Sequence, residues 1–362
     1  MKAIFKVLIL LFLISSCRKE GNTDFIWEKS FGTGDALFVR STTDSGFVSC
    51  GELESKPYLI KFSKGRKVIV DVSLESEGLF SSAWSDKSGY IAAGNTGGKI
   101  LFARFSPSGV NLWDTAITAG FKVDRTTLCY SGGSDLLAVA TAIPDSANSG
   151  ATGLVFIRLD STGHVIEKKE ITDTIFVSAN KAFVDNAGDI YLPLTRKPTL
   201  VKSKASVAKF NSNFQKLWET VLYNNPNFSA ATLDINPDAS GNIYVSGKTE
   251  LYSGESVMNN SFFASLSGTG TVRWKQYREN INEGIALVLN DDILMMLNTN
   301  CFAVSMANPL NGDDSGNIRI FDACDSKTTD AFGRDMDVTH DGNILVAGSK
   351  GGSFFLALRS SL

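Results

Sequence analysis

Residues 43–51 read TDSGFVSCG, an Asp/Gly turn followed by a short apolar strand. The same type of strand recurs along the chain as FVSCG (47–51), YIAAG (90–94), LAVAT (137–141), IYLPL (190–194), IYVSG (243–247), ILMML (293–297) and ILVAG (344–348). Repeats of about 40–50 residues are typical of propellers and solenoids, in which each repeat is one supersecondary unit. The recurrence therefore predicts a chain built from seven similar units.

An Asp/Gly turn precedes most copies of this strand. These turns cover residues 44–46, 86–89, 185–188, 238–241 and 341–342. Glycine adopts the positive φ that tight hairpins require, and aspartate bonds the backbone of its own turn. The turns lack the acidic spacing of a calcium loop. We interpret them as structural hairpin turns, and we predict no metal site.

Two more strands follow each copy except the last, which is followed by one. The first resembles YLIKF (58–62) or LFARF (101–105), and the second carries a large side chain eight residues after the last Phe or Leu of the first. Its residues at that position are Val70, Trp113, Glu167, Trp218 and Trp274, with Ile320 or Phe321 in the sixth repeat. Aromatic residues at one repeated position are expected to fill the space between neighbouring sheets rather than to stack on a ligand.

A further inner strand ahead of each copy completes four strands per repeat. The inner strands are expected near 36–42, 79–85, 124–130, 176–183, 229–235, 283–289 and 333–339. Residues 25–29 (FIWEK) match the outer strand at 112–115, whereas the last repeat ends at FFLAL (354–358) without one. The sequence thus predicts an all-β, seven-bladed β-propeller of four-stranded blades, whose ring is closed by the N-terminal outer strand.

The first 17 residues read MKAIFKVLILLFLISSC, with lysines at positions 2 and 6 and an apolar run over 7–14. That run is shorter than the roughly 20 residues a membrane-spanning helix needs, and it fits a signal peptide. The segment ending at Cys17 resembles the lipobox of bacterial lipoproteins. The resemblance implies a signal peptide at 1–16, a lipid on Cys17, a tether at 17–24, a propeller domain at 25–362, and membrane attachment through the lipid.

The repeats resemble those of β-propeller lipoproteins from Bacteroidota-type Gram-negative bacteria, whose blades carry T-x-D-G-G-Y-I-x-A-G elements. Residues 43–47, with Cys50 and Gly51, are the nearest match in this chain. The resemblance implies an exported outer-membrane lipoprotein, periplasmic or surface-exposed. It implies architecture rather than activity.

The net charge and the motifs of the chain exclude some classes of partner and cofactor. Loss of Lys2 and Lys6 with the signal peptide moves the net charge from −3 to −5, whereas nucleic-acid binding favours a basic face. We therefore expect no nucleic-acid partner. The vicinal disulfide, calcium site and docking motifs of quinoprotein dehydrogenases are not visible, and we expect no cofactor and a monomeric domain.

The cysteines and histidines indicate little chemistry. Cys301 and Cys324 would face each other if their strands form a hairpin near Gly312, so they are the candidate disulfide. Cys50 and Cys129 are expected to be buried free thiols. The two histidines, at positions 164 and 340, both fall in turns, which leaves little material for a Ser-His-Asp triad or a zinc site. We assign no catalytic residue.

Candidate acids lie on the predicted inner strands. Asp335 and Asp337 alternate around Met336 and should point to the same side, and Asp234 could join them from another strand. If that side is the central channel, they form the best acidic pair for glycoside hydrolysis. The alternative interpretation is a solvated channel wall.

Three long loops of neighbouring blades, at 143–153, 195–205 and 248–261, are the candidate binding surface. Its residues are Arg196, Lys197, Lys202, Lys204, Tyr252 and Met258. The hypothesis is a lipid-anchored cell-envelope propeller that binds or scaffolds a protein or glycan. The alternative is a hydrolase or lyase acting on polysaccharide, which would require acids and aromatics converging at one end of the channel.

Overall fold

The structure is a computed structural model that describes residues 25–120, 122–130, 135–143, 152–173, 176–179, 181–197, 203–223, 228–253, 256–279, 283–290, 292–299, 302–319 and 330–360. Within these ranges all regular secondary structure is β-strand, which confirms the prediction of an all-β chain. No helix of the length and apolarity needed to cross a membrane occurs among the described residues.

Four sheets contain four antiparallel strands in sequence order. The first two are β5 (Leu79–Asp86), β6 (Gly89–Thr96), β7 (Lys99–Phe105) and β8 (Asn111–Ile117), and β9 (Lys122–Tyr130), β10 (Leu136–Ile143), β11 (Thr152–Leu159) and β12 (Val165–Asp173). The other two are β18 (Phe228–Pro237), β19 (Ile243–Ser253), β20 (Ser256–Leu266) and β21 (Val272–Arg278), and β22 (Gly284–Asn290), β23 (Ile293–Asn298), β24 (Ala303–Ala307) and β25 (Asp314–Arg319).

A fifth sheet has an inner strand in two pieces. Both pieces pair with the same neighbour, and the sheet consists of β13 (Phe176–Ala179), β14 (Phe183–Val184), β15 (Ile190–Lys197), β16 (Lys204–Phe210) and β17 (Lys216–Tyr223). The interruption between the two pieces contains residues 181–182, which matter for the functional site.

The remaining sheet has seven strands because β1 belongs to two groups. Its order is β26 (Ala331–Val338), β27 (Ile344–Lys350), β28 (Ser353–Arg359), β1 (Phe25–Ser41), β2 (Phe47–Leu53), β3 (Lys56–Phe62) and β4 (Val68–Ser73). The first part of β1 pairs with β28, with Glu28 opposite Ala357, and its second part pairs with β2, with Val39 opposite Ser49. The N-terminal strand is therefore the outer neighbour of the last strand, as its sequence indicates.

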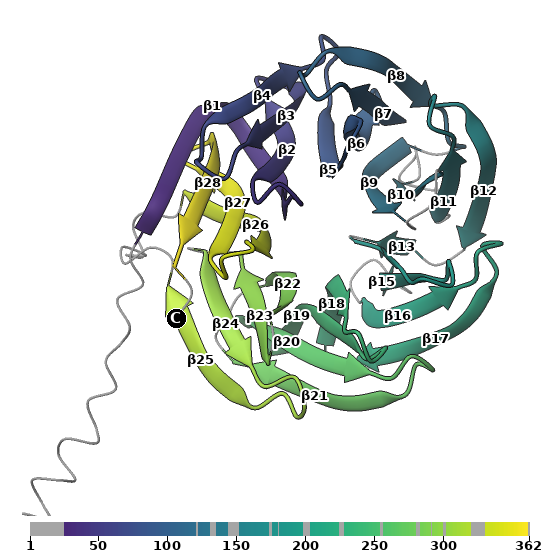
Figure 1. Ribbon diagram of the computed structural model, residues 1–362. Helices are drawn as coiled ribbons and strands as arrows, with labels where there is room; N and C mark the ends of the chain where they lie inside the picture. Colours follow the sequence, from purple (N-terminus) through teal and green to yellow (C-terminus); the bar gives the residue numbers. More distant parts are fainter. Residues whose placement is uncertain are drawn as a thin grey trace, which may run out of the picture.

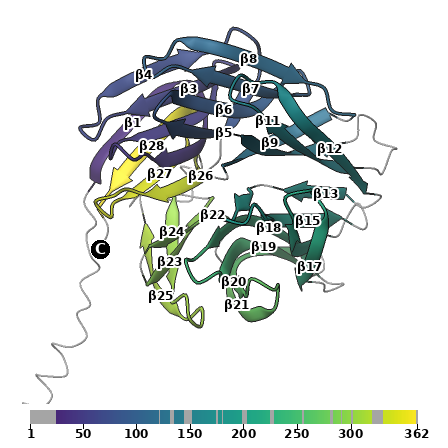
Figure 2. The same ribbon diagram turned by 45° about the vertical axis from the view of Figure 1, so that its right-hand side comes forward.

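The sheets stand radially around a common centre (Figures 1 and 2), which is the architecture of a β-propeller. Strands β5, β9, β13, β18, β22 and β26 lie near the centre, while β8, β12, β17, β21 and β25 lie outside. Every predicted inner-strand range coincides with one of these inner strands or with the second part of β1.

The repeated tryptophans pack between neighbouring sheets, as predicted. Trp113 packs against an apolar cluster formed by β6 and β7 of its own sheet and by β9, β10 and β11 of the next sheet. The turn of the next sheet approaches it so closely that a Cβ on Gly163 would lie 2.8 Å from the indole ring. Gly270 and Gly312 meet the tryptophans of the sheets before them in the same way. All three glycines have positive φ, so conformation and space both favour glycine at this position, the last but one of the turn.

We expect Gly163→Ala to destabilise the protein by about 2–3 kcal/mol, because its φ of +86° is strained for alanine and the methyl group must displace the indole. The matched control is Gly241→Ala, whose φ is +80° but whose Cβ would meet nothing within 4 Å. That variant should lose only about 1 kcal/mol. Urea unfolding measures both, and equal losses would show that the contact with the indole is unimportant.

The sheet of β9–β12 lacks the tryptophan, and the turn of the following sheet compensates for it. Glu167 stands at the tryptophan position, paired across the strand with Arg158. In the following turn the fourth position is Phe214 rather than glycine, with φ +58° and no exposed surface. Its ring stacks on Phe156, with centroids 4.9 Å apart. A large side chain in a strained turn thus replaces the missing aromatic residue of the strand.

The prediction for the sixth repeat was wrong. The turn at Gly312 is present, but β25 begins at Asp314, and Gly316 pairs with Met306 as Trp218 pairs with Lys209. Gly316 therefore occupies the tryptophan position, whereas Ile320 and Phe321 lie outside the described residues. This turn contains one more residue than the others, so the position lies nine rather than eight residues after the last residue of the preceding strand, Ala307.

The Asp/Gly turns are structural hairpins. Asp238 accepts hydrogen bonds from the backbone amides of Ser240 and Asn242, each at 2.8 Å. Asp44 accepts the amide of Gly46 and also pairs with the buried Lys61 of β3 at 2.9 Å. Cations on the third strand of a sheet thus hold the turn between its first two strands.

Candidate functional site

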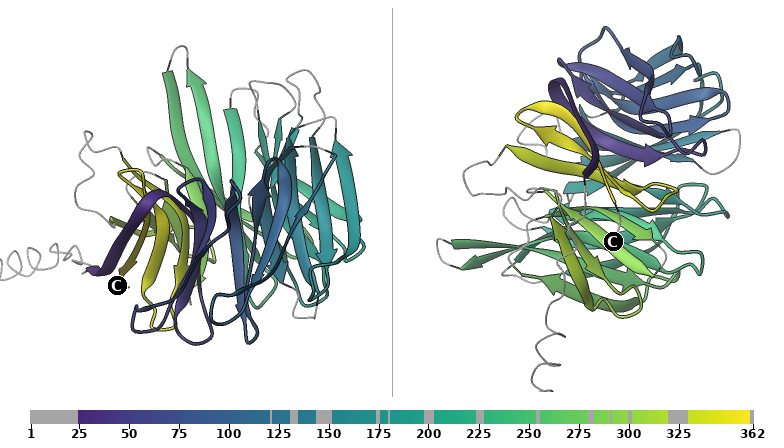
Figure 3. Two further views of the ribbon diagram at one scale, coloured as in Figure 1. Left: turned by 90° about the horizontal axis from the view of Figure 1, so that it is seen from above. Right: turned by 60° about the vertical axis from the view of Figure 1, so that its left-hand side comes forward.

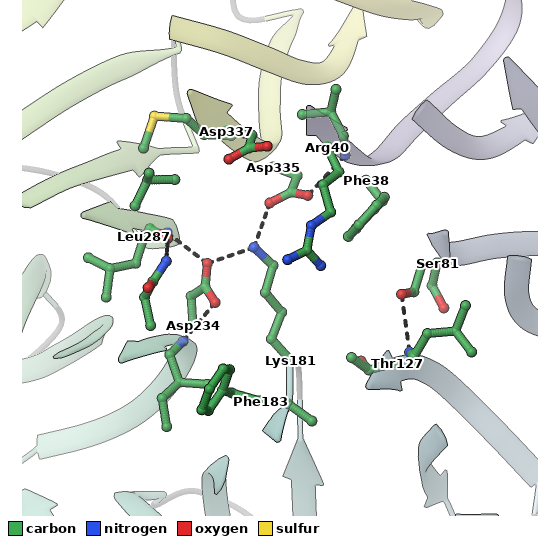
Figure 4. A pocket seen from close by; sticks show the side chains of 18 of the residues that line it. Phe38, Arg40, Ser81, Thr127, Lys181, Phe183, Asp234, Leu287, Asp335 and Asp337 are labelled. Atoms are coloured by element: carbon green, nitrogen blue, oxygen red, sulfur yellow. Dashed lines mark hydrogen bonds and ion pairs between the residues drawn. The ribbon is translucent and has the colours of Figure 1, made fainter. Parts of the chain in front are cut away.

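A cavity of about 240 Å³ lies where the inner strands converge (Figure 4). It is lined by residues of β1, β5, β9, β14, β18, β22 and β26, together with the link at 181–182. Asp234, Asp335 and Asp337 all belong to the lining. The structure therefore brings together the three acids that the sequence placed on inner strands.

One-residue irregularities in the inner strands set the direction of these acids. The pairing of β18 with β19 shifts just before Asp234, and that of β26 with β27 shifts just before Asp335. The same shift precedes Ser82 on β5. A β-bulge re-aims the side chain that follows it, and here it turns the side chain toward the next sheet. Ser82 accordingly accepts the amide of Leu128 on β9 at 3.1 Å.

The two buried acids connect neighbouring inner strands. Asp234 accepts the amide of Leu287 on β22 through Oδ2 and that of Ile235 through Oδ1, both at 2.7 Å. Asp335 accepts the amide of Val39 on β1 through Oδ2 at 3.0 Å. Both carboxylates are almost completely buried. They supply hydrogen bonds between inner strands that do not pair with each other through their backbones.

Lys181 joins the two acids. Its Nζ lies 2.7 Å from Oδ2 of Asp234 and 2.7 Å from Oδ1 of Asp335, and Figure 4 shows it reaching between them. The side chain is 28% exposed and comes from the interruption between β13 and β14. Lys181 is not among the residues predicted from the sequence. The sequence could have indicated it, because Lys181 is the one cation in the predicted inner strand at 176–183, and two other predicted inner strands contain the candidate acids.

The protonation states follow from burial and charge. Burial raises the pKa of Asp234 to about 6, although Lys181 opposes the shift. Burial also raises the pKa of Asp337. For Lys181 burial acts in the opposite direction, but the two carboxylates outweigh it and raise the pKa above the usual lysine value. Lys181 is therefore a protonated counterion at neutral pH rather than a base or nucleophile.

Asp337 and Arg40 form the more open side of the cavity. Asp337 accepts the amide of Ser41 at 2.6 Å, so it faces β1 as Asp335 does, and the prediction that the two acids share a side is confirmed. Arg40 is exposed, and its guanidinium carbon lies 4.3 Å from the centroid of the Trp84 ring on β5. A cation on an aromatic face is thus presented to the cavity.

The predicted loop surface is built differently from the expectation. Residues 248–261 are not a loop, because β19 and β20 continue through them and pair as far as Ser253 and Ser256. The result is a hairpin that projects beyond the neighbouring strands (Figure 3). The prediction of a loop was wrong here, because polar residues also sustain the pairing of two antiparallel strands.

The residues proposed for that surface are divided. Arg196 pairs with Glu219 of β17, with Nη2 2.7 Å from Oε2, and is mostly buried, so it is not an open contact. Lys204 is half-buried at the start of β16, whereas Met258 is exposed on β20. The backbones of Lys197 and Tyr252 belong to β15 and β19.

Several predictions fall on parts of the chain that the structure does not describe. Cys17, Lys202, Cys301 and Cys324 lie outside the described residues, so the lipid and the disulfide stay predictions. Cys50 and Cys129 are buried free thiols, as predicted. His164 and His340 are exposed turn residues, also as predicted.

No protein family model and no curated protein matches the chain. Solved structures do: the WD40 domain of Neurospora crassa Pan2 (TM-score 0.60, 11% identity, 94% of this chain and 97% of that one) and the β-propeller domain of Myceliophteria thermophila Cps50 (Swd1) (0.59, 10%, 92% and 99%). The polysaccharide lyase Uly1 is also similar (0.58, 10%, 96% and 94%). At these identities the likeness shows the fold alone. The chain is a β-propeller.

Proposed function

We propose that the protein is a lipid-anchored cell-envelope propeller that binds or scaffolds a protein or glycan. In this proposal it is exported, carries its lipid on Cys17, and is held at the outer membrane, periplasmic or surface-exposed, as a monomeric domain. The two strand groups that share β1 each count as a blade, which gives seven. The pairing of β1 with β28 supports a ring closed by the N-terminal outer strand.

The observation that favours binding over catalysis is the use of the buried carboxylate oxygens. Both oxygens of Asp234 and both of Asp335 accept hydrogen bonds from backbone amides or from Lys181. A general acid or nucleophile must instead reach a substrate atom. These acids therefore have a structural role, because they connect the inner strands of neighbouring blades. They do not favour the hydrolase or lyase alternative.

The cavity supports a binding role on its open side. Arg40 lies over the ring of Trp84 beside Asp337, and it is a cation that can pair with a carboxylate or another anionic group. Its charge is fixed, and the ring beneath it limits the side-chain freedom lost on binding. An anionic group on a glycan or on a protein loop is the chemistry that this side of the cavity recognises.

The test is a binding screen of the mature protein against glycans and polysaccharides, with analysis of products. We expect binding without cleavage, and at least about a tenfold weaker affinity for Arg40→Gln, because a charge-assisted hydrogen bond contributes about 1.5–3 kcal/mol. Lys122→Gln, at an exposed lysine on β9, is the control and should bind normally. If no glycan binds, crosslinking from position 40 should capture a protein partner. Release of shortened products would contradict the proposal.

A further inference from the structure

One turn of the propeller differs from its equivalents in charge. Six described turns lead into outer strands: residues 63–67, 106–110, 160–164, 211–215, 267–271 and 308–313. Only the turn at 63–67 contains lysine or arginine, and it contains three of them: Lys64, Arg66 and Lys67. Since the six turns are structurally alike, the fold itself does not require this charge.

The same turn continues into exposed apolar residues. All six residues from 64 to 69 are exposed, with Val68 39% and Ile69 46% accessible. Lys64 faces Asp341 at 3.6 Å, but both side chains are more than half exposed, so this pair is weak. The segment therefore presents three cations followed by two aliphatic side chains.

This surface lies beside the point where the chain enters the domain. Arg66 donates a hydrogen bond to the carbonyl oxygen of Ile26, and the rings of Trp27 and Phe62 are 5.2 Å apart. Cys17 precedes Phe25 by eight residues, which span at most about 28 Å when extended. A lipid on Cys17 would keep residues 64–69 close to the bilayer.

We infer that residues 64–69 form a docking surface for a bilayer that contains anionic lipids. The inference rests on the lipid anchor of the proposed function and adds an orientation to it. Lysine and arginine near an anionic membrane surface each contribute about 1 kcal/mol, and aliphatic side chains enter the interface beside them. The chain as a whole has more acidic than basic residues, so we expect this basic edge to be the side that meets the membrane.

Docking at this edge sets the direction of the β19–β20 hairpin. The turn at 63–67 lies at the same end as the Asp/Gly turns, since Lys61 pairs with Asp44 and Lys64 with Asp341. Strand β19 starts at that end, after the turn at 238–242, and runs to the other end. The projecting hairpin therefore points away from the bilayer.

The experiment measures lysine accessibility in the acylated protein. The protein is added to preformed vesicles of phosphatidylcholine, with or without phosphatidylglycerol, or kept in detergent. A membrane-impermeant reagent then modifies accessible amines, and mass spectrometry measures how far each lysine is modified. Lys64 and Lys67 should be modified about fivefold less in anionic vesicles, which corresponds to about 1 kcal/mol per residue. High salt should remove the protection. Lys99 and Lys122, exposed on β7 and β9, are internal controls and should not change.

Two matched variants test the apolar part. Ile69→Ser should reduce the protection of Lys64 and Lys67, whereas Leu112→Ser, at the equivalent exposed position on β8, should leave it unchanged. Equal modification of the four lysines in every condition would overturn the docking surface. So would equal protection with and without anionic lipid, or protection that grows with protein concentration in the absence of vesicles.

The mass of the N-terminal peptide separates the two proposals. An acylated Cys17 with unprotected lysines leaves the anchor intact and overturns the docking surface. An unacylated Cys17 overturns the anchor. The unacylated chain is then added to the same vesicles at higher lipid concentration, where salt-sensitive protection of Lys64 and Lys67 supports the surface and its absence overturns it.

Discussion

Replacing Lys181 with methionine should destabilise the propeller by about 3–5 kcal/mol at pH 7.5, the usual cost of removing one partner from a buried ion pair. Lys181 lies 2.7 Å from an oxygen of both Asp234 and Asp335, which are buried on separate inner strands. Without the ammonium, two neighbouring carboxylates lose their counterion in a region of low polarity. Urea unfolding of the wild type and the variant measures the difference.

The loss should depend on pH. Burial already raises the pKa of Asp234 to about 6, and removal of Lys181 raises it further. A raised acid pKa means that the folded state binds more protons than the unfolded state in the window above about pH 4, so stability falls as pH rises through that window. The deficit of Lys181→Met should therefore be smaller at pH 5 than at pH 7.5.

Lys99→Met is the matched control, because Lys99 is exposed and its replacement should change stability by less than about 0.5 kcal/mol. A deficit below about 1 kcal/mol for Lys181→Met, or the same deficit at both pH values, would show that the carboxylates do not depend on Lys181.

Replacing Phe214 with glycine should cost about 2–4 kcal/mol. Loss of a buried phenylalanine costs about 3–5 kcal/mol, and relief of the strain at φ +58° returns about 1 kcal/mol. The ring is completely buried and stacks on Phe156 between the third and fourth blades. Denaturant unfolding measures the loss.

Two further variants identify the cause. Arg66→Gly changes the same turn position in the first blade, where φ is +62° and the side chain is exposed, so it should lose at most about 0.5 kcal/mol. The double variant Phe214→Gly with Glu167→Trp recreates the contact between a tryptophan and a turn glycine that other blades have. We expect the double variant to be more stable, by at least about 1 kcal/mol, than the sum of the two single changes predicts. Additive changes in the free energy of unfolding would contradict the idea that Phe214 replaces the missing tryptophan.

Local repetition made much of this fold predictable. The short apolar strand, the Asp/Gly turn and the tryptophan position each depend on chemistry within a few residues, so the strands, their order and every inner-strand range could be located from the sequence. The partner of the N-terminal strand could also be named, because residues 25–29 match an outer strand and the last repeat lacks one. The acids at 234, 335 and 337 followed from their places on inner strands.

Two predictions were wrong at places where the pairing of strands, rather than the local composition, determines the structure. The segment at 248–261 is polar enough to read as a loop, yet it pairs as strands because its neighbours set the register. In the sixth blade one additional turn residue moves Gly316 into the tryptophan position. Strands are predicted from the alternation of apolar and polar residues, and neither feature changes that alternation.

The residue pattern is enough to predict a β-propeller, the positions of its inner strands and the candidate acids on two of them. The role of those acids depends on contacts between blades. Lys181 is 53 residues from Asp234 and 154 residues from Asp335, and β-bulges invisible to alternation turn both acids toward the next blade. Contacts over such separations form only when the blades converge on one axis, because no local preference brings a cation of one blade between the carboxylates of two others.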